Sequence, residues 1–455
     1  MYIPGDVVVN GVYPVHMPGM EPLTCGMLYK NGAMLVEAMK WTIENVNNKN
    51  ILNGVTLGGL ALDDCFTAFK GLHEVTSVRR HGMTVKDSNG NALDPATIDG
   101  YHGGYLTTFV LPLAKLMNEI KRPQIAINPT SSEGHNYPYL IYMTYGTDKI
   151  IKAYILMLKK LGWHYIQAVH DPDTFSRSFV KDFKEMAGKH GICVVASYEI
   201  SSDMTGSDIV DKLRRQSTVQ PVLAITREVM LNQIFNSLKS QNSSGQFNMI
   251  TLVSKSSNSF MGYQDVAKGT INIGYRMPDI PEFIQHLSML TANSAGVANP
   301  WFSSWFEVLY NCSLDATSMR TYTTVCDRNR NVGAAPGISY PSSVTSTIYG
   351  IYAFAFGLHE TLKEYCGVNY IGVCGDYRNA ADRGERLVEK IKAITFNVDG
   401  KTNIQFKNGE INFPLEYYFW NGPNSAWIKV GKLLSLWVQK KLFICMHSTV
   451  SCAMI

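Results

Sequence analysis

The sequence lacks any run of about 20 uncharged apolar residues, the length that an α-helix needs to cross a lipid bilayer. The stretch 433–455 comes closest, but Lys440 and Lys441 interrupt it. The start also lacks the charged and apolar regions of a secretory signal peptide, because strand-like sequence begins already at 6–10. We therefore predict no membrane span, and we expect the chain to be a fragment or an incomplete version of a longer protein.

Strong charge of one sign is also absent. The chain has 41 basic and 37 acidic residues, so its formal net charge is only +4. Its basic residues form short pairs such as Arg79-Arg80, which are typical of solvated helix faces. This balance disfavours nucleic acid and anionic membrane surfaces as partners.

The sequence motifs of common enzyme classes are missing as well. There is no GxGxxG fingerprint, Walker loop, GxSxG elbow, HExxH or CxxC, and Gly103-Gly104 fits none of these patterns. His170 ends a predicted strand and is followed by Asp171 and Asp173, the best-placed candidates for catalysis. A strand-end histidine is more often a packing residue, and loops are rich in aspartate for reasons of turn geometry. We therefore expect no enzyme, no cofactor and no metal.

The nine cysteines are spaced for local disulfides rather than for zinc. Cys312 and Cys326 bracket one short loop, and Cys366 and Cys374 bracket another. Disulfides indicate an oxidising, secreted setting, and two N-glycosylation sequons agree with it. The sequons begin at Asn242 and Asn311.

Apolar runs typical of buried strands alternate with stretches of helical period. Leu35, Met39, Ile43 and Val46, for example, form one apolar helix face. Such a series predicts a parallel sheet covered by helices, and a second series begins where Thr147 is placed to cap a helix. The predicted strands are 7–15, 56–62, 124–128, 165–170, 192–200, 222–226, 249–254 and 270–275, and further predicted helices are 107–120, 148–161, 175–187, 208–216, 228–240, 344–364 and 385–394.

Two consecutive series predict an α/β fold of two doubly wound lobes. Ligands of such sheets bind outside the carboxyl ends of the strands, where the strand order reverses. We therefore expect the cleft between the lobes to be the binding site, and closure around a ligand to be the main motion.

Several motifs in a fixed order carry a more specific signal. The run Asn299-Pro-Trp-Phe302 is followed by Trp305-Phe306 and Cys312, and 351–358 reads IYAFAFGL ahead of Cys366 and Cys374. Together with 36–39, 123–126 and 162–165, these motifs resemble the ligand-binding domain of metabotropic glutamate receptors, which are G-protein-coupled, over about residues 5 to 430. The resemblance implies two lobes of periplasmic-binding-protein type I (Venus flytrap) architecture. It assigns 1–146 and 277–412 to lobe 1 and 147–276 and 413–432 to lobe 2, leaving 433–455 as a tail without family likeness.

The resemblance also sorts the cysteines. It implies the disulfides Cys25–Cys65, Cys312–Cys326 and Cys366–Cys374. Cys193 corresponds to the cysteine that ties this lobe to a cysteine-rich module in the family, whereas Cys445 and Cys452 lie in the tail. The intersubunit cysteine of the family would fall within 81–99, where this sequence has none. We therefore expect a homodimer held by packing of lobe 1 alone.

The amino-acid site of the family maps onto a small set of positions. Thr107 and Thr130 stand where hydroxyls of lobe 1 hold the α-carboxylate, with Asn128 and Pro129 beside the second. Asp148 matches one carboxylate of lobe 2 that meets the ligand's ammonium group.

Other positions depart from the family pattern. Phe175 replaces a tyrosine that presents its ring to the ammonium, and Lys255 stands in place of a second carboxylate. The cations that hold the side-chain carboxylate of glutamate are also replaced, an arginine by Leu35 and a lysine by Asn408. Losing both would remove several kcal/mol of glutamate affinity, on the order of two charge-assisted hydrogen bonds. We expect a different small ligand, such as a less acidic amino acid, or lobes that no longer bind one.

The sequence thus predicts the extracellular ligand-recognition module of a metabotropic-glutamate-type receptor at the cell membrane. A G protein would be reached only through transmembrane parts that this chain does not contain. The alternatives are an ectodomain of the natriuretic-peptide-receptor or guanylyl-cyclase type, a periplasmic-type amino-acid binding protein, and a truncated soluble decoy.

Overall fold

The structure is a computed structural model of the chain. It describes residues 1–128, 131–252, 260, 262–274, 277–293, 299–315, 322–398, 400, 402–413, 415–421, 427–434, 437–438, 443–444 and 453–454. The sequence-based assignments at Pro129, Thr130, Lys255, Cys445 and Cys452 lie outside these ranges.

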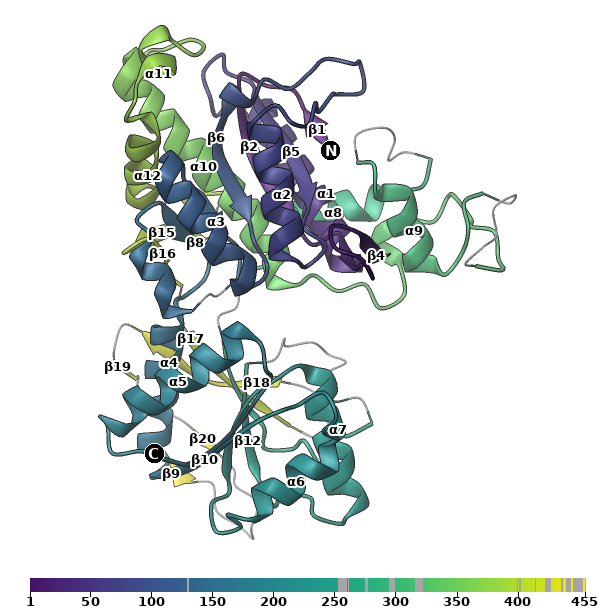
Figure 1. The fold of residues 1–455 in the computed structure, drawn as a ribbon, viewed down its shortest axis with the longest axis vertical. Helices are drawn as coiled ribbons and strands as arrows, with labels where there is room; N and C mark the ends of the chain where they lie inside the picture. Colours follow the sequence, from purple (N-terminus) through teal and green to yellow (C-terminus); the bar gives the residue numbers. More distant parts are fainter. Residues whose placement is uncertain are drawn as a thin grey trace. The chain divides into compact units, whose positions relative to one another are not determined.

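The chain forms two compact units, each made of two separate stretches. Unit 1 comprises Met1–Tyr145 and Met277–Asn412, and unit 2 comprises Gly146–Arg276 and Phe413–Ile455. Each unit contains its own mainly parallel sheet with helices on both faces, as a doubly wound fold requires (Figure 1).

The sheet of unit 1 has nine strands in the order β1-β5-β2-β6-β7-β8-β16-β15-β14. The strands from β5 to β16 are parallel to their neighbours, and β1, β15 and β14 add antiparallel edges. The strand bounds are β1 (Tyr2–Ile3), β2 (Val7–Tyr13), β5 (Leu57–Asp63), β6 (Ile98–Gly103), β7 (Gln124–Ala126), β8 (Leu140–Tyr142), β14 (Thr395–Asn397), β15 (Asn403–Lys407) and β16 (Glu410–Ile411). A small hairpin of β3 (His16–Pro18) and β4 (Cys25–Leu28) follows β2.

Side-chain alternation along β2 assigns the helices of unit 1 to two faces. Val8 and Val12 pack with residues of α2 and α3 in one apolar cluster. On the other face, glycines let helices approach closely: a Cβ on Gly59 would lie 2.3 Å from the Ile43 side chain of α1, and one on Gly100 would lie 2.3 Å from Phe354 of α10. The helices of unit 1 are α1 (Lys30–Asn48), α2 (Ala68–Arg79), α3 (Thr107–Ile120), α8 (Pro281–Met289), α9 (Phe302–Tyr310), α10 (Ser342–Cys366), α11 (Gly375–Asn379) and α12 (Arg383–Ala393).

A buried carboxylate ties α1 to the later stretch of unit 1. Glu37 is 1% exposed and accepts hydrogen bonds from His286 Nε2 at 3.0 Å and Asn299 Nδ2 at 3.1 Å. Lys40 Nζ lies 3.4 Å away. Asn299 opens the Asn-Pro-Trp-Phe run, and Phe302, Trp305 and Phe306 are buried, so this family motif serves packing.

The sheet of unit 2 has the order β10-β9-β11-β12-β13-β17-β18-β19. The strands from β10 to β13 are parallel, whereas β17 and β18 are antiparallel to their neighbours. The strand bounds are β9 (Tyr165–His170), β10 (Cys193–Glu199), β11 (Pro221–Ile225), β12 (Asn248–Thr251), β13 (Ile271–Gly274), β17 (Leu415–Trp420), β18 (Trp427–Leu434) and β19 (Trp437–Val438). Two short strands, β20 (Phe443–Ile444) and β21 (Ala453–Met454), pair with each other.

Helices cover both faces of this second sheet. Val222 and Ala224 of β11 pack in one apolar cluster with α6 (Gly206–Arg214) and α7 (Glu228–Ser240). The other pair, α4 (Thr147–Lys160) and α5 (Thr174–Gly188), meet through the rings of Tyr154 and Phe179, whose centroids lie 6.1 Å apart. The predicted fold class, two doubly wound α/β lobes, is confirmed.

Some elements differ from the sequence-based expectation. Thr147 was expected to cap α4, but Gly146 is the N-cap residue and Thr147 is the first helical residue, so this expectation was wrong. Strand β6 was not predicted because its buried Asp99 and His102 interrupt any apolar run. Helix α2 was not predicted because only Gly71, Val75 and Val78 of its residues are buried, too few to mark a helical period.

Disulfides close two short loops and one longer loop of unit 1. They join Cys25 to Cys65, Cys312 to Cys326, and Cys366 to Cys374, the same pairs that the family resemblance implies. Within the described part of the chain, none of the helices has the length and apolar character needed to cross a bilayer.

Candidate functional site: the carboxyl edges of the two sheets

In unit 1 the parallel strands β2, β5, β6 and β7 end at Tyr13, Asp63, Gly103 and Ala126. Because parallel strands end at one edge, the loops that follow them gather there, together with the N-terminus of the helix after each strand. This edge is where a doubly wound sheet binds its ligands.

The N-terminus of α3 supplies an unused hydroxyl at this edge. Thr107 is the first residue of α3 and is 4% exposed, and its Oγ1 makes no hydrogen bond to any described residue. The N-cap residue, Leu106, has no side chain that could cap the helix. A hydroxyl donor beside the positive end of a helix dipole is an arrangement suited to a carboxylate.

Aromatic rings lie beside this position. Tyr29, Phe66 and Tyr105 pack edge to face, with ring centroids 5.0 Å, 5.6 Å and 6.2 Å apart, and all three are half-buried. Asn128, which follows β7, donates from Nδ2 to the Tyr105 carbonyl at 3.1 Å. Asn128 therefore holds the loop that precedes α3. The ring cluster could not be predicted from sequence patterns, because its members lie in three separate loops.

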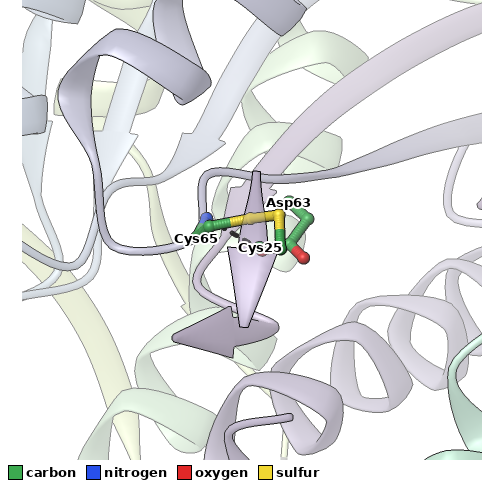
Figure 2. Close-up of side chains that lie close together, drawn as sticks. All are labelled: Cys25, Asp63 and Cys65. Carbon is green, nitrogen blue, oxygen red and sulfur yellow. Dashed lines mark hydrogen bonds between the residues drawn. A yellow bond between two sulfur atoms is a disulfide. The ribbon is translucent and has the colours of Figure 1, made fainter. Parts of the chain in front are cut away.

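The loop after β5 is fixed by a disulfide and by two aspartates. Figure 2 shows the Cys25–Cys65 disulfide next to Asp63, whose Oδ1 accepts from the Cys65 N–H at 2.9 Å. Asp63 also accepts from His16 Nδ1 at 2.5 Å. Burial, reinforced by the charge of Asp63, raises the pKa of Asp64 to about 7. The two sulfur atoms are bonded to each other, so this group is a structural clamp and not a set of thiolate ligands.

The two residues that the sequence resemblance places at cationic positions of the family, Leu35 and Asn408, have structural roles here. Leu35 is 0% exposed, within the buried face of α1. Asn408 and Gly409 form the two-residue turn between β15 and β16, with φ angles of +55° and +76°. Asparagine followed by glycine suits this type of turn because both residues tolerate positive φ. Asn408 is therefore explained by backbone geometry, and neither residue offers a charge.

In unit 2, the N-termini of α4, α5 and α7 gather with the ends of β9, β11 and β12. Thr147 of α4 is 0% exposed and its Oγ1 has no partner among the described residues. Asp148 accepts from Lys152 Nζ at 3.1 Å, one turn along the same helix. Phe175, in the first turn of α5, is half-buried with its ring centroid 5.8 Å from that of Phe179.

A cluster of polar residues lies at the ends of the neighbouring strands β9 and β11 of unit 2. Asp171 is 4% exposed and accepts from Thr226 Oγ1 at 2.7 Å, from the Arg227 backbone N–H at 3.0 Å, and from Arg227 Nε at 3.1 Å. His170 Nδ1 lies 2.9 Å from the Asp171 carbonyl. His170 and Asp171, which the sequence offered as catalytic candidates, thus both take part in hydrogen bonds within the protein. Arg227 gave no periodic signal; its place in the short loop after β11, as Asp171 lies in the loop after β9, is the clue that could have identified it.

The remaining predicted sites lie on the surface. Cys193 is free and exposed at the start of β10. Asn242 and Asn311 are exposed and have φ angles of +50° and +51° at the ends of α7 and α9, a conformation that asparagine tolerates well.

The chain matches the family model described as "Receptor family ligand binding region" over residues 35–422. It is 25% identical over 404 residues to the metabotropic glutamate receptor of Drosophila melanogaster, covering 80% of this chain and 41% of that protein. It is 25% identical over 430 residues to metabotropic glutamate receptor 8 of Rattus norvegicus, covering 90% and 47%. With metabotropic glutamate receptor 4 of Mus musculus, the identity is 22% over 446 residues, covering 93% and 48%.

The chain thus spans less than half the length of each of these relatives. The resemblance inferred from the sequence motifs is confirmed, and with it the fold of periplasmic-binding-protein type I. The chain belongs to the family of receptor ligand-binding regions, which are recognition domains and not enzymes.

Proposed function

We propose that the chain is the ligand-recognition part of a metabotropic-glutamate-type receptor, and that it binds a small amino-acid-like ligand in a cleft between lobes that correspond to the two units. The observation that carries the proposal is Thr107, whose buried hydroxyl has no partner among the described residues and stands at the N-terminus of α3. An α-carboxylate accepting from this hydroxyl and from the first-turn amides would satisfy an otherwise unpaired group.

Unit 2 would supply the contacts to the ammonium group of the ligand. Phe175 offers a ring face to an ammonium group, and Asp148 offers a carboxylate one helix away. Pro129, Thr130 and Lys255 remain part of the proposed site on sequence grounds alone. A ligand that contacts both units binds the closed arrangement better, so closure would follow as a shift of populations.

The proposed binding site is not selective for glutamate. Leu35 is wholly buried and Asn408 is a turn residue, so neither can supply the cation that the side-chain carboxylate of glutamate would need. Each missing charge-assisted bond is worth roughly 1.5–3 kcal/mol, and about 1.4 kcal/mol corresponds to a tenfold loss of affinity. Glutamate should therefore bind at least about a hundredfold more weakly than to a site with both cations.

A thermal-shift screen of the purified chain tests this proposal. The compounds are the standard amino acids and the corresponding carboxylic acids that lack the α-amino group. Stabilisation that saturates with concentration identifies a ligand, and glutamate should not rank first. Failure of every compound to stabilise the chain, or preferential tight binding of glutamate, would overturn it.

The partner proposed for unit 1 is a second copy of this chain. An apolar groove of about 540 Å³ runs between α2 and α3, and Phe69 on its rim is 65% exposed. Its rim also carries Lys115 and Glu119, which bear opposite charges one turn apart, so two copies related by a twofold axis could pair them reciprocally. Such a dimer needs no intersubunit disulfide.

In the cell, the proposal places the chain on the extracellular face of the membrane as part of a longer receptor. Signalling to a G protein would depend on parts outside the chain. Exposed Asn242 and Asn311 are compatible with glycosylation there.

A further inference from the structure

Three aromatic rings form a closed cluster at the carboxyl edge of the unit 1 sheet. Tyr29 is the N-cap residue of α1, Phe66 lies in the loop after β5, and Tyr105 lies in the loop after β6. Each ring packs edge to face against the other two, with centroid distances of 5.0 Å, 5.6 Å and 6.2 Å. All three residues are half-buried. The cluster is therefore not closed off in the core, and it lies at the edge where a doubly wound sheet binds its ligands.

The cluster adjoins the hydroxyl that is proposed to hold the α-carboxylate. Tyr105 stands two residues before Thr107, and Leu106 between them has extended backbone and is 39% exposed. Asn128 donates from Nδ2 to the Tyr105 carbonyl at 3.1 Å and so fixes this loop. Two residues of extended chain span at most about 7 Å. A ligand whose carboxylate binds at Thr107 can therefore bring its own side chain against the rings.

The backbone that carries Phe66 is held in an uncommon conformation. Cys65 and Phe66 have φ angles of +46° and +56°, a region that bulky residues rarely adopt. The Cys25–Cys65 disulfide ties this loop to β4. The Cys65 N–H donates to Asp63 Oδ1 at 2.9 Å. The Phe66 N–H donates to Oδ1 of the buried Asp64, also at 2.9 Å. Strained backbone that several bonds maintain is typical of sites that present a side chain in one position, so the Phe66 ring is preoriented.

The polar atoms of the cluster already have partners within the protein. The Tyr29 hydroxyl accepts from Asn31 Nδ2 at 3.1 Å and lies 3.5 Å from the Tyr105 hydroxyl. Phe66 has no polar side-chain atom. The cluster therefore offers a ligand mainly the faces and edges of its rings, and these surfaces pack best against another aromatic ring, in edge-to-face or offset geometry.

We propose that the ring cluster binds the side chain of the ligand, and that the preferred ligand is an amino acid with an aromatic side chain. Its α-carboxylate is held at Thr107, so both contacts belong to unit 1, and the inference rests on the proposed function for that carboxylate. The charges agree with this ligand class, because Leu35 and Asn408 supply no cation for an acidic side chain. The three rings of the cluster determine specificity.

Calorimetric titration of the full chain with L-phenylalanine and with L-alanine tests the inference, because the two probes differ only in the phenyl ring. Wild type should bind phenylalanine at least about 10-fold more tightly than alanine. Phe66→Leu and Tyr105→Leu should each weaken phenylalanine binding roughly 3- to 10-fold and leave alanine binding as in wild type.

The matched control is Tyr310→Leu in α9 of the same unit. Tyr310 is also half-buried, and its ring centroid lies 5.0 Å from that of Phe306, but it does not belong to the cluster. This variant should keep the wild-type ratio of the two affinities. Melting temperatures verify that all variants are folded, and Tyr29→Leu replaces any ring variant that is not.

The outcomes separate this inference from the proposed function. Phenylalanine binding that Thr107→Val weakens but the ring variants leave intact would overturn the role of the cluster and leave the carboxylate site standing. Binding that depends on the rings but not on Thr107 would support the cluster and refute the carboxylate site. A wild-type chain that does not bind phenylalanine, or binds alanine equally well, would also overturn the inference. Binding of a different amino acid that depends on Thr107 would in that case still support the proposed function.

Discussion

Replacing Glu37 with alanine removes the acceptor at the centre of a buried polar group in unit 1. The carboxylate is 1% exposed, and it binds His286 at 3.0 Å and Asn299 at 3.1 Å with Lys40 nearby at 3.4 Å. These partners come from three separate segments, so the change leaves buried donors unpaired where α1 meets the later stretch of the unit. Breaking such a pair costs about 3–5 kcal/mol.

The matched control is Glu44→Ala on the same helix. Glu44 pairs with the same lysine at 3.6 Å, but its side chain is 46% exposed, so its loss should cost no more than about 1 kcal/mol. Urea unfolding followed by circular dichroism measures both variants. Equal losses of stability in Glu37→Ala and Glu44→Ala would contradict the conclusion that the buried Glu37 carboxylate stabilises the contact between α1 and the later stretch of unit 1.

The same carboxylate gives the prediction a pH dependence. Burial raises the pKa of Glu37, but the hydrogen bonds from His286 and Asn299 and the charge of Lys40 outweigh burial, so its pKa lies below the ordinary value of 4.5. A carboxyl whose pKa is lower in the folded state stabilises the fold above its unfolded pKa and loses that contribution as the pH falls through its folded pKa. The stability difference between wild type and Glu37→Ala should therefore be full at neutral pH and shrink in acid below pH 4.5.

Three further outcomes are expected. Phe69→Glu should shift the chain from dimer to monomer in analytical ultracentrifugation, because it places a charge in the groove between α2 and α3; an unchanged dimer would exclude that face. Burial lowers the pKa of His102 to about 3, so this histidine stays neutral while the unfolded state takes up a proton below the ordinary value of 6.5. Wild type should lose on the order of 1.4 kcal/mol per pH unit between these values, and His102→Gln should lack that component; parallel pH profiles would contradict it. When the chain is secreted from eukaryotic cells, Asn242→Gln and Asn311→Gln should each remove one glycan from its mass, and an unchanged mass would rule out modification at that site.

Sequence patterns predicted the fold where burial is apolar and continuous. Helix α1 was identified from Leu35, Met39, Ile43 and Val46, all of which are 0% exposed. Strand β6 was missed because Asp99 and His102 are buried with polar partners: Tyr377 donates to Asp99 at 2.9 Å, and Tyr13 lies 2.8 Å from His102. A prediction based on runs of apolar residues therefore misses a buried strand that contains polar residues.

The candidate site was less accessible to sequence reasoning. Thr107 was identified as a candidate ligand-binding residue only through the family resemblance, since nothing in the sequence shows that its hydroxyl lacks a partner. Asn408 was interpreted from the resemblance as a lost ligand contact, and its positive φ adds a backbone reason for asparagine in this turn that the sequence alone does not show. Arg227 was not singled out because its significance depends on Asp171, 56 positions away in the sequence.

Calorimetry on Thr107→Val tests the central claim most directly. The titrant is the compound that stabilises wild type most strongly in the thermal-shift screen, and the control is Thr108→Val, an exposed neighbour in the same helical turn. Thr107→Val should weaken binding by roughly 10-fold or more because the carboxylate loses a hydroxyl donor, while Thr108→Val should bind like wild type. Equal affinities for wild type and Thr107→Val would contradict carboxylate capture at the N-terminus of α3.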